Sequence, residues 1–181
     1  MTSLTRRTAI TALGALALAP AASAESAAEI DVNVDMALRK LYATVEGASD
    51  LAARAEGVLI MPDVIKGGLI IGGAYGEGAL RIGDQTAGYY SVAAGSIGYQ
   101  IGVQKTSHAL FFMTAAALEN FRNASGWELG ADAEFTVPGD GVSVNIDSTT
   151  AKSAIIAVIF AQDGLLAGAS LEGAKYTRLK R

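Results

Sequence analysis

Few residues in this chain have the types and spacing that catalysis requires. The sequence has one histidine, His108, and no cysteine, which excludes a cysteine nucleophile, a thiolate zinc site, a disulfide framework and a multi-histidine metal site within one chain. His108 lies in the polar segment Lys105–Ala109, which predicts an exposed loop histidine. Ser96 and Ser170 lie among glycines, but neither has glycine two positions away on both sides, as a nucleophile elbow needs. A serine hydrolase using His108 is the weaker alternative.

Two carboxylates interrupt glycine-rich apolar segments of the chain. Glu77 and Glu172 each stand in such a segment, where a carboxylate must pair, hydrate or have a raised pKa. We expect structural pairing with Arg81 or Arg122 rather than catalysis. The glycine spacing of Gly73–Gly78 is the reverse of the dinucleotide fingerprint, and no Gly-Lys-Ser/Thr follows any glycine loop. Nucleotide binding is therefore not expected.

The composition describes an ordered, acidic chain of single-domain size. It has 181 residues, 51% of them hydrophobic and 18% charged, with a net charge of −4. The acidic balance argues against a nucleic-acid partner. The segment Asp31–Asp35 resembles the opening of a calcium loop, but Met36 replaces the required glycine and Tyr42 the required glutamate. We expect these acids to cap a helix, and we expect no metal and no cofactor.

Residues 1–24 have the pattern of a cleaved export signal. Arg6 and Arg7 form a basic start, Ala9–Ala19 is apolar, and Ala22–Ala24 is a small-x-small cleavage site. The arginine pair suggests the twin-arginine route, and the apolar run is too short to span a bilayer. Cleavage removes two of 14 basic and none of 18 acidic residues, leaving 12 basic residues and a net charge of −6. We expect an exported protein, periplasmic or in the cell envelope, without a transmembrane span in the mature chain.

Helical periodicity is confined to short segments. Apolar residues at three- and four-residue steps predict a helix over residues 34–45. A second helix is expected from Ser49 to Ala55, and a third between Ala115 and Asn123 with Leu118 and Phe121 facing inward. Helices this short bury their apolar stripes only by docking on another element.

Elsewhere the hydrophobic period is two, as in β-strands. Trp127–Val137 alternates strictly, and the turn that follows it leads into Val142–Ile146, which together predict a hairpin. Leu110–Met113 and Ile155–Phe160 are continuous apolar runs, which fit central strands. Asp163-Gly164 predicts a turn after the second run.

Glycines leave one face of the segment Lys66–Leu80 nearly bare. The even positions of that segment carry Gly68, Gly72, Ala74, Gly76 and Gly78. A bare face allows close approach of another element or a sharp bend of the sheet. We predict an α+β fold for a single domain over residues 25–181. In it, N-terminal helices pack on a strongly curved, mostly antiparallel, glycine-rich β-sheet that is barrel-like.

Several blocks of this sequence, in order, resemble the SYLF domain. They include Gly57–Pro62, Gly72–Gly78, Gly126–Gly130 and Gly164–Gly173, and the likeness spans Ala28–Arg178. The resemblance implies lipid binding without catalysis. Eukaryotic members bind phosphoinositides and remodel membranes, and some fungal members also bind actin filaments. Bacterial members with export signals are similar to envelope proteins that bind phospholipid.

We therefore expect an exported, non-enzymatic protein that binds phospholipid or an anionic membrane surface. Such a surface attracts each nearby lysine or arginine by about 1 kcal/mol, and the basic C-terminal tail Lys175–Arg181 has four cations. The alternative outside catalysis is a structural or protein-interaction module of the envelope. The candidate lipid-binding residues are Arg39, Lys40, Lys66, Arg81, Lys105, Arg122, Lys175, Tyr176, Arg178, Leu179, Lys180 and Arg181.

Overall fold

The computed structural model describes residues 25–68, 71–97, 102–129, 134–136, 153–164, 171 and 173–181. Four predicted features lie outside these residues: the export signal, Ser170, Glu172 and the strand at 142–146. The described helices are α1 (Ala27–Thr44), α2 (Ala48–Arg54) and α3 (Ala115–Asn123). The described strands are β1 (Gly57–Gly68), β2 (Ile71–Ile82), β3 (Gln85–Ile97), β4 (Gly102–Phe112), β5 (Trp127–Glu128), β6 (Glu134–Thr136), β7 (Ile155–Gly164) and β8 (Lys175–Leu179).

The helices begin where local caps allow them to begin. Ser26 and Glu29 form a capping box that starts α1, so this helix begins before the segment that periodicity predicts. Gly47, in the left-handed conformation, precedes α2 without a side-chain cap, so Ser49 lies inside this helix rather than capping it. The predicted third helix is confirmed as α3, which begins after Thr114 and buries Leu118 and Phe121.

All eight described strands form one sheet in the order β5-β8-β3-β2-β1-β4-β7-β6. Its pairs are antiparallel except β6 with β7. A hydrogen bond of 2.8 Å joins Tyr176 Oη on β8 to His108 Nε2 on β4, although three strands separate β8 from β4 in the sheet order. In a flat sheet these strands would lie about 19 Å apart. The sheet is therefore strongly curled, which confirms the predicted α+β fold.

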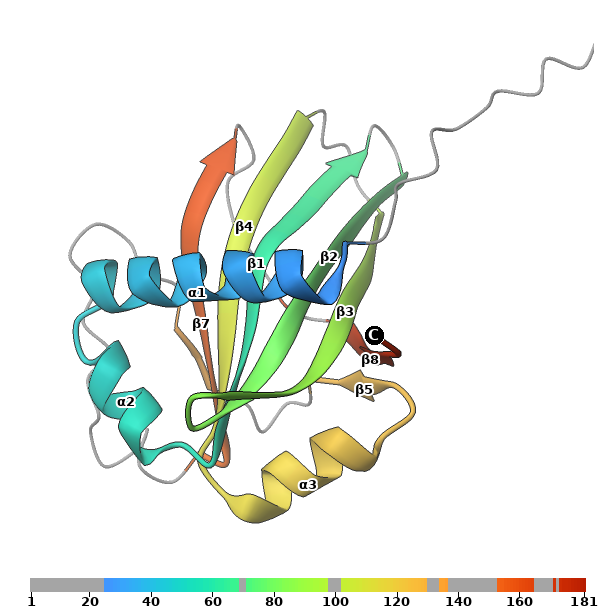
Figure 1. The fold of residues 1–181 in the computed structure, drawn as a ribbon. Helices are drawn as coiled ribbons and strands as arrows, with labels where there is room; N and C mark the ends of the chain where they lie inside the picture. The colour runs from blue at the N-terminus through green and yellow to red at the C-terminus, as the bar shows by residue number, and fades with distance from the viewer. Residues whose placement is uncertain are drawn as a thin grey trace, which may run out of the picture.

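Apolar residues cover both faces of the curled sheet. On the outer face, α1 packs its buried residues Ile30, Val34 and Leu41 over the strands, and α2 adds Leu51. Figure 1 shows α1 crossing in front of the sheet, with α3 below the strands. On the inner face, Phe121 of α3 joins the aromatic and aliphatic side chains that fill the curl.

The bare glycine face lies on the inside of the bend. The register of β1 against β2 shifts between Ile60 and Ile65, and β1 there approaches β2 closely. A Cβ atom at Gly78 would overlap the Ile60 carbonyl oxygen and lie 2.8 Å from Met61 Sδ. At Gly76 it would lie 2.9 Å from a side-chain methyl carbon of Val64. These two glycines are the close-approach positions that the curvature requires.

Two strand predictions were wrong. Trp127–Val137 is not one strand of a hairpin, because β5 pairs with β8 and β6 pairs with β7, at opposite edges of the sheet. Asp163-Gly164 is not a turn, because β7 continues through both residues and pairs them with Lys105 and Gln104.

Candidate functional site

Helix α1 has apolar side chains on both of its faces. Ile30, Val34 and Leu41 are fully buried against the sheet, whereas Val32 is 59% and Met36 is 58% exposed. Val32 and Met36 are four residues apart and therefore lie together on the solvent face of the helix. The exposed side chains of Arg39 and Lys40 follow on the next turn.

The outer face of the sheet carries a second group of exposed apolar side chains. Tyr75 is 53%, Ile65 54% and Val103 67% exposed. Ile65 is the cross-strand neighbour of both Tyr75 and Lys105, so these three form a row across β2, β1 and β4. Figure 1 shows these strands continuing past α1. The row thus occupies sheet surface that the helix leaves uncovered.

A groove lies between α1 and Lys105, the cross-strand neighbour of Ile65. It has a volume of about 240 Å³ and is lined by Met36 and Lys40 of α1, by Asp63, and by Lys105 of β4. Lys105 Nζ lies 2.9 Å from Asp63 Oδ1, with both side chains about half exposed. We call the combined surface the outer apolar face. It consists of Val32, Met36, Arg39, Lys40, Ile65, Tyr75, Val103 and Lys105.

Two other predicted site residues are engaged within the fold. Arg81 forms ion pairs with Asp35 at 2.7 Å and Asp31 at 3.3 Å. Tyr176 is 1% exposed and lies in the inner core, so no membrane reaches it without unfolding. Burial raises the pKa of its hydroxyl, which remains protonated and bonded to His108.

The remaining predicted cations do not lie on the outer apolar face. Lys66 is half buried and lines a small recess of the inner face that also contains His108. Arg122 is exposed on α3. Residues 175–179 form strand β8 against β3 rather than a tail. In this C-terminal segment Lys175, Arg178 and Lys180 are exposed, and Leu179 is half buried.

Glu77 is paired, as predicted, but with a different arginine. Its side chain is 6% exposed, and its carboxylate accepts hydrogen bonds from Arg181 Nη2 at 2.6 Å and from Tyr75 Oη at 2.7 Å. Neither Arg81 nor Arg122 is the arginine that holds it. Arg181 is therefore a structural residue, although its type and position suggested a membrane contact.

We expect Arg181→Ala to lower the free energy of unfolding by about 2 kcal/mol, because it leaves the Glu77 carboxylate buried without its cation. Denaturant unfolding measures this change. Arg178→Ala, which removes an exposed arginine from the same segment, should change stability by no more than about 0.5 kcal/mol. Equal losses of unfolding free energy in both variants would show that the contact between Arg181 and Glu77 contributes nothing to stability.

His108 is not an exposed loop residue. It lies in β4, is 1% exposed, and is hydrogen-bonded to Tyr176. Burial lowers its pKa to about 3, so the ring is neutral near pH 7. Its partner is a tyrosine rather than a serine, which gives the hydrolase alternative no support from the described residues. Among those residues, no group of three or more histidine or acidic side chains could hold a metal.

The curled sheet and its covering helices define a small α+β domain. Residues 93–180 match the family model Ysc84, described as Las17-binding protein actin regulator. This match is consistent with the SYLF family that the sequence resembles. No curated protein matches the chain. Among the described helices, none has the length and apolar character needed to cross a membrane.

Proposed function

We propose that this protein is an exported, non-enzymatic phospholipid-binding protein that associates with anionic membrane surfaces. The outer apolar face is the observation that supports this proposal most directly. There Val32 and Met36 are more than half exposed on a helix whose other apolar stripe is already buried. The association of the Ysc84 family with lipid binding supports the same function, and the pattern of residues 1–24 supports export.

The composition of the outer apolar face suits weak, reversible attachment. Arg39, Lys40 and Lys105 each gain about 1 kcal/mol near an anionic leaflet, and Lys105 gains less while it is paired with Asp63. Insertion of Val32 and Met36 among the head groups adds a hydrophobic contribution. The summed binding free energy is sufficient for peripheral, salt-sensitive attachment, and it is much smaller than the free energy of a permanent anchor.

The double variant Val32→Ser/Met36→Ser should weaken binding to phosphatidylglycerol vesicles about tenfold, because it removes the apolar groups that insert. Both side chains are exposed, so the fold should be retained. Co-sedimentation of residues 25–181 with vesicles at low and high ionic strength measures the effect. Failure of the unmodified protein to sediment with any phospholipid composition would reject lipid binding.

A charge-matched pair of variants identifies which surface makes the contact. Lys40→Ser/Lys105→Ser removes two cations from the outer apolar face, and Lys175→Ser/Lys180→Ser removes two from the C-terminal segment. We expect the first pair to weaken vesicle binding several-fold more than the second, since only the first pair adjoins the exposed apolar groups. The opposite ranking would assign the contact to the C-terminal segment instead.

A protein-interaction module is the second candidate function, because the description of the Ysc84 family names a protein partner and actin regulation. The outer apolar face is the surface that such a partner would cover. Capture from a native envelope extract, followed by analysis of both lipid and protein, separates the two functions. Recovery of a stoichiometric protein that Val32→Ser/Met36→Ser abolishes, with no phospholipid, would favour the module.

A further inference from the structure

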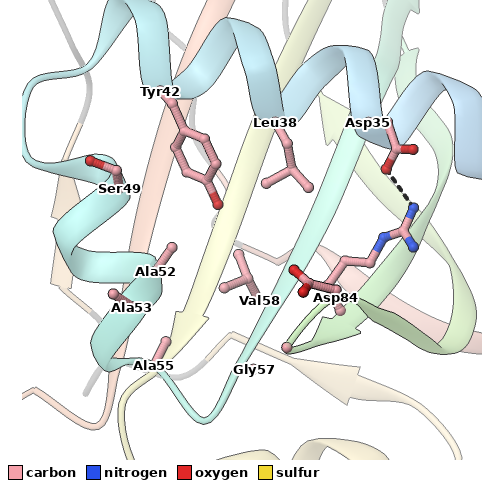
Figure 2. Close-up of a pocket in the computed structure, with 12 residues that line it drawn as sticks. Asp35, Leu38, Tyr42, Ser49, Ala52, Ala53, Ala55, Gly57, Val58 and Asp84 are labelled. Atoms are coloured by element: carbon pink, nitrogen blue, oxygen red, sulfur yellow. Dashed lines mark hydrogen bonds and ion pairs between the residues drawn. The ribbon is translucent and has the colours of Figure 1, made fainter.

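A pocket of about 560 Å³ lies between α1, α2 and the β2–β3 turn, a size that suits small molecules. Figure 2 shows Tyr42 and Leu38 projecting from α1 towards Val58. The pocket exists because α2 presents only small side chains to it, namely Ser49, Ala52 and Ala53, followed by Ala55. It is separate from the groove that joins the outer apolar face.

One end of this pocket is acidic. Asp35, Asp84 and Arg81 line it, and Asp84 is exposed in the β2–β3 turn. Arg81 is the single cation of the lining, and its guanidinium already pairs with Asp35 and with Asp31. The two lining carboxylates therefore exceed the one arginine. An anionic head group would meet net repulsion here, whereas a cation would be attracted.

The other end of the pocket is apolar and aromatic. Tyr42 is 42% exposed, and it stands beside Leu38, which is half buried, and Val58, which is buried. Burial raises the pKa of Tyr42, so its ring stays uncharged at neutral pH. This end of the pocket therefore suits an apolar body, whereas the carboxylates at the opposite end attract an ammonium group by charge.

We propose that this pocket binds a small ammonium compound with an apolar body. The ammonium group lies by Asp35 and Asp84, and the apolar body lies on Leu38, Tyr42 and Val58. Two kinds of ligand carry such an ammonium group: a phospholipid with an amino-containing head group, and a free amine. This site differs from the outer apolar face in position and in the charge that it selects.

The first test compares three probes that share one hexyl chain. Hexyltrimethylammonium should bind residues 25–181 at least about tenfold more tightly than hexanoate, with hexanol between them, in a titration followed by NMR chemical shifts. Shifts should be centred on α2 and on Tyr42. Equal affinities for the three probes, or shifts centred elsewhere, would overturn the proposal.

Two variants and one control locate the site. Asp84→Asn keeps a turn-forming side chain and should weaken hexyltrimethylammonium binding about three- to fivefold. Ala53→Leu fills the pocket from an exposed helical position and should abolish binding. Glu119→Gln, which removes an exposed carboxylate from α3, should leave binding unchanged. Unchanged binding in both pocket variants, with their folds intact, would also overturn the proposal.

Competition then distinguishes the two sources. Displacement of the probe by phosphatidylethanolamine vesicles, with no displacement by phosphatidylglycerol vesicles, would support the lipid head group. Displacement by free ethanolamine alone would support a soluble amine. Stronger displacement by phosphatidylglycerol than by either amine would contradict the charge preference on which the site depends.

Discussion

Gly78→Ala should destabilise the protein by about 3 kcal/mol or more, although it adds a single methyl group. A Cβ atom at this position overlaps the Ile60 carbonyl oxygen and approaches Met61 Sδ to 2.8 Å. The obstacle at Ile60 is backbone, which moves only if the β1–β2 pairing opens. Thermal or denaturant unfolding measures the loss, and a fully unfolded variant is the extreme form of the expected result.

Gly95→Ala is the matched control for this prediction. Gly95 also lies within a strand, β3, but a Cβ atom there meets nothing within 4 Å. Since glycine in a strand interior costs about 0.5–1 kcal/mol relative to alanine, Gly95→Ala should be neutral or slightly stabilising. Similar stability of the Gly78 and Gly95 variants would show that the sheet does not depend on the close approach of β1 and β2.

Acidification should unfold the protein partly through His108. Burial lowers the pKa of this ring from 6.5 to about 3. As the pH falls below 6.5, the unfolded chain binds a proton there, whereas the folded protein does not until about pH 3. The free energy of unfolding should therefore fall by up to about 1.4 kcal/mol per pH unit across this window. Above pH 6.5 this group should have no effect.

Carboxylates also titrate in the lower part of this window, so the His108 effect must be measured as a difference. His108→Gln keeps an uncharged polar side chain that can bond Tyr176, and it removes the titration. Denaturant unfolding of both proteins from pH 7 to pH 4 should show a shallower loss of stability in the variant. Parallel curves would show that His108 takes up its proton in the folded state as readily as in the unfolded chain.

Local sequence signals predicted the elements whose type is determined by their own adjacent residues. Periodicity predicted α3, and the apolar runs predicted the parts of β4 and β7 that lie inside the sheet. The glycines that leave one face bare predicted the curvature, since Gly76 and Gly78 lie where β1 and β2 approach. Each of these signals is carried by a few adjacent residues.

Sequence patterns gave wrong predictions where a strand pairs with segments that are distant in the chain. Alternation over Trp127–Val137 predicts a strand, but it does not say that β5 and β6 pair at opposite edges of the sheet. The polar segment before Leu110 resembles a loop, yet it is strand because β1 and β7 pair with it on both sides. His108 is buried there because the curl brings Tyr176 to it.

The candidate site was predicted only in part. Arg39, Lys40 and Lys105 were identified by charge, but charge did not distinguish them from Arg81 and Arg181, which pair with acids. Val32 and Met36 were missed because periodicity was used to find the buried stripe of α1. Their four-residue spacing, opposite the residues of that stripe, was the available signal.

The burial of one apolar stripe of α1 determines how the helix can approach a bilayer. Ile30, Val34 and Leu41 hold it on the sheet, so releasing them to lipid would dismantle the outer core. The proposed docking on a membrane should therefore occur as a rigid body, with no ordering cost at the moment of contact and with amide hydrogen exchange in α1 no faster than in the free protein. Rapid association and rapid release are the kinetics expected of such a preformed surface.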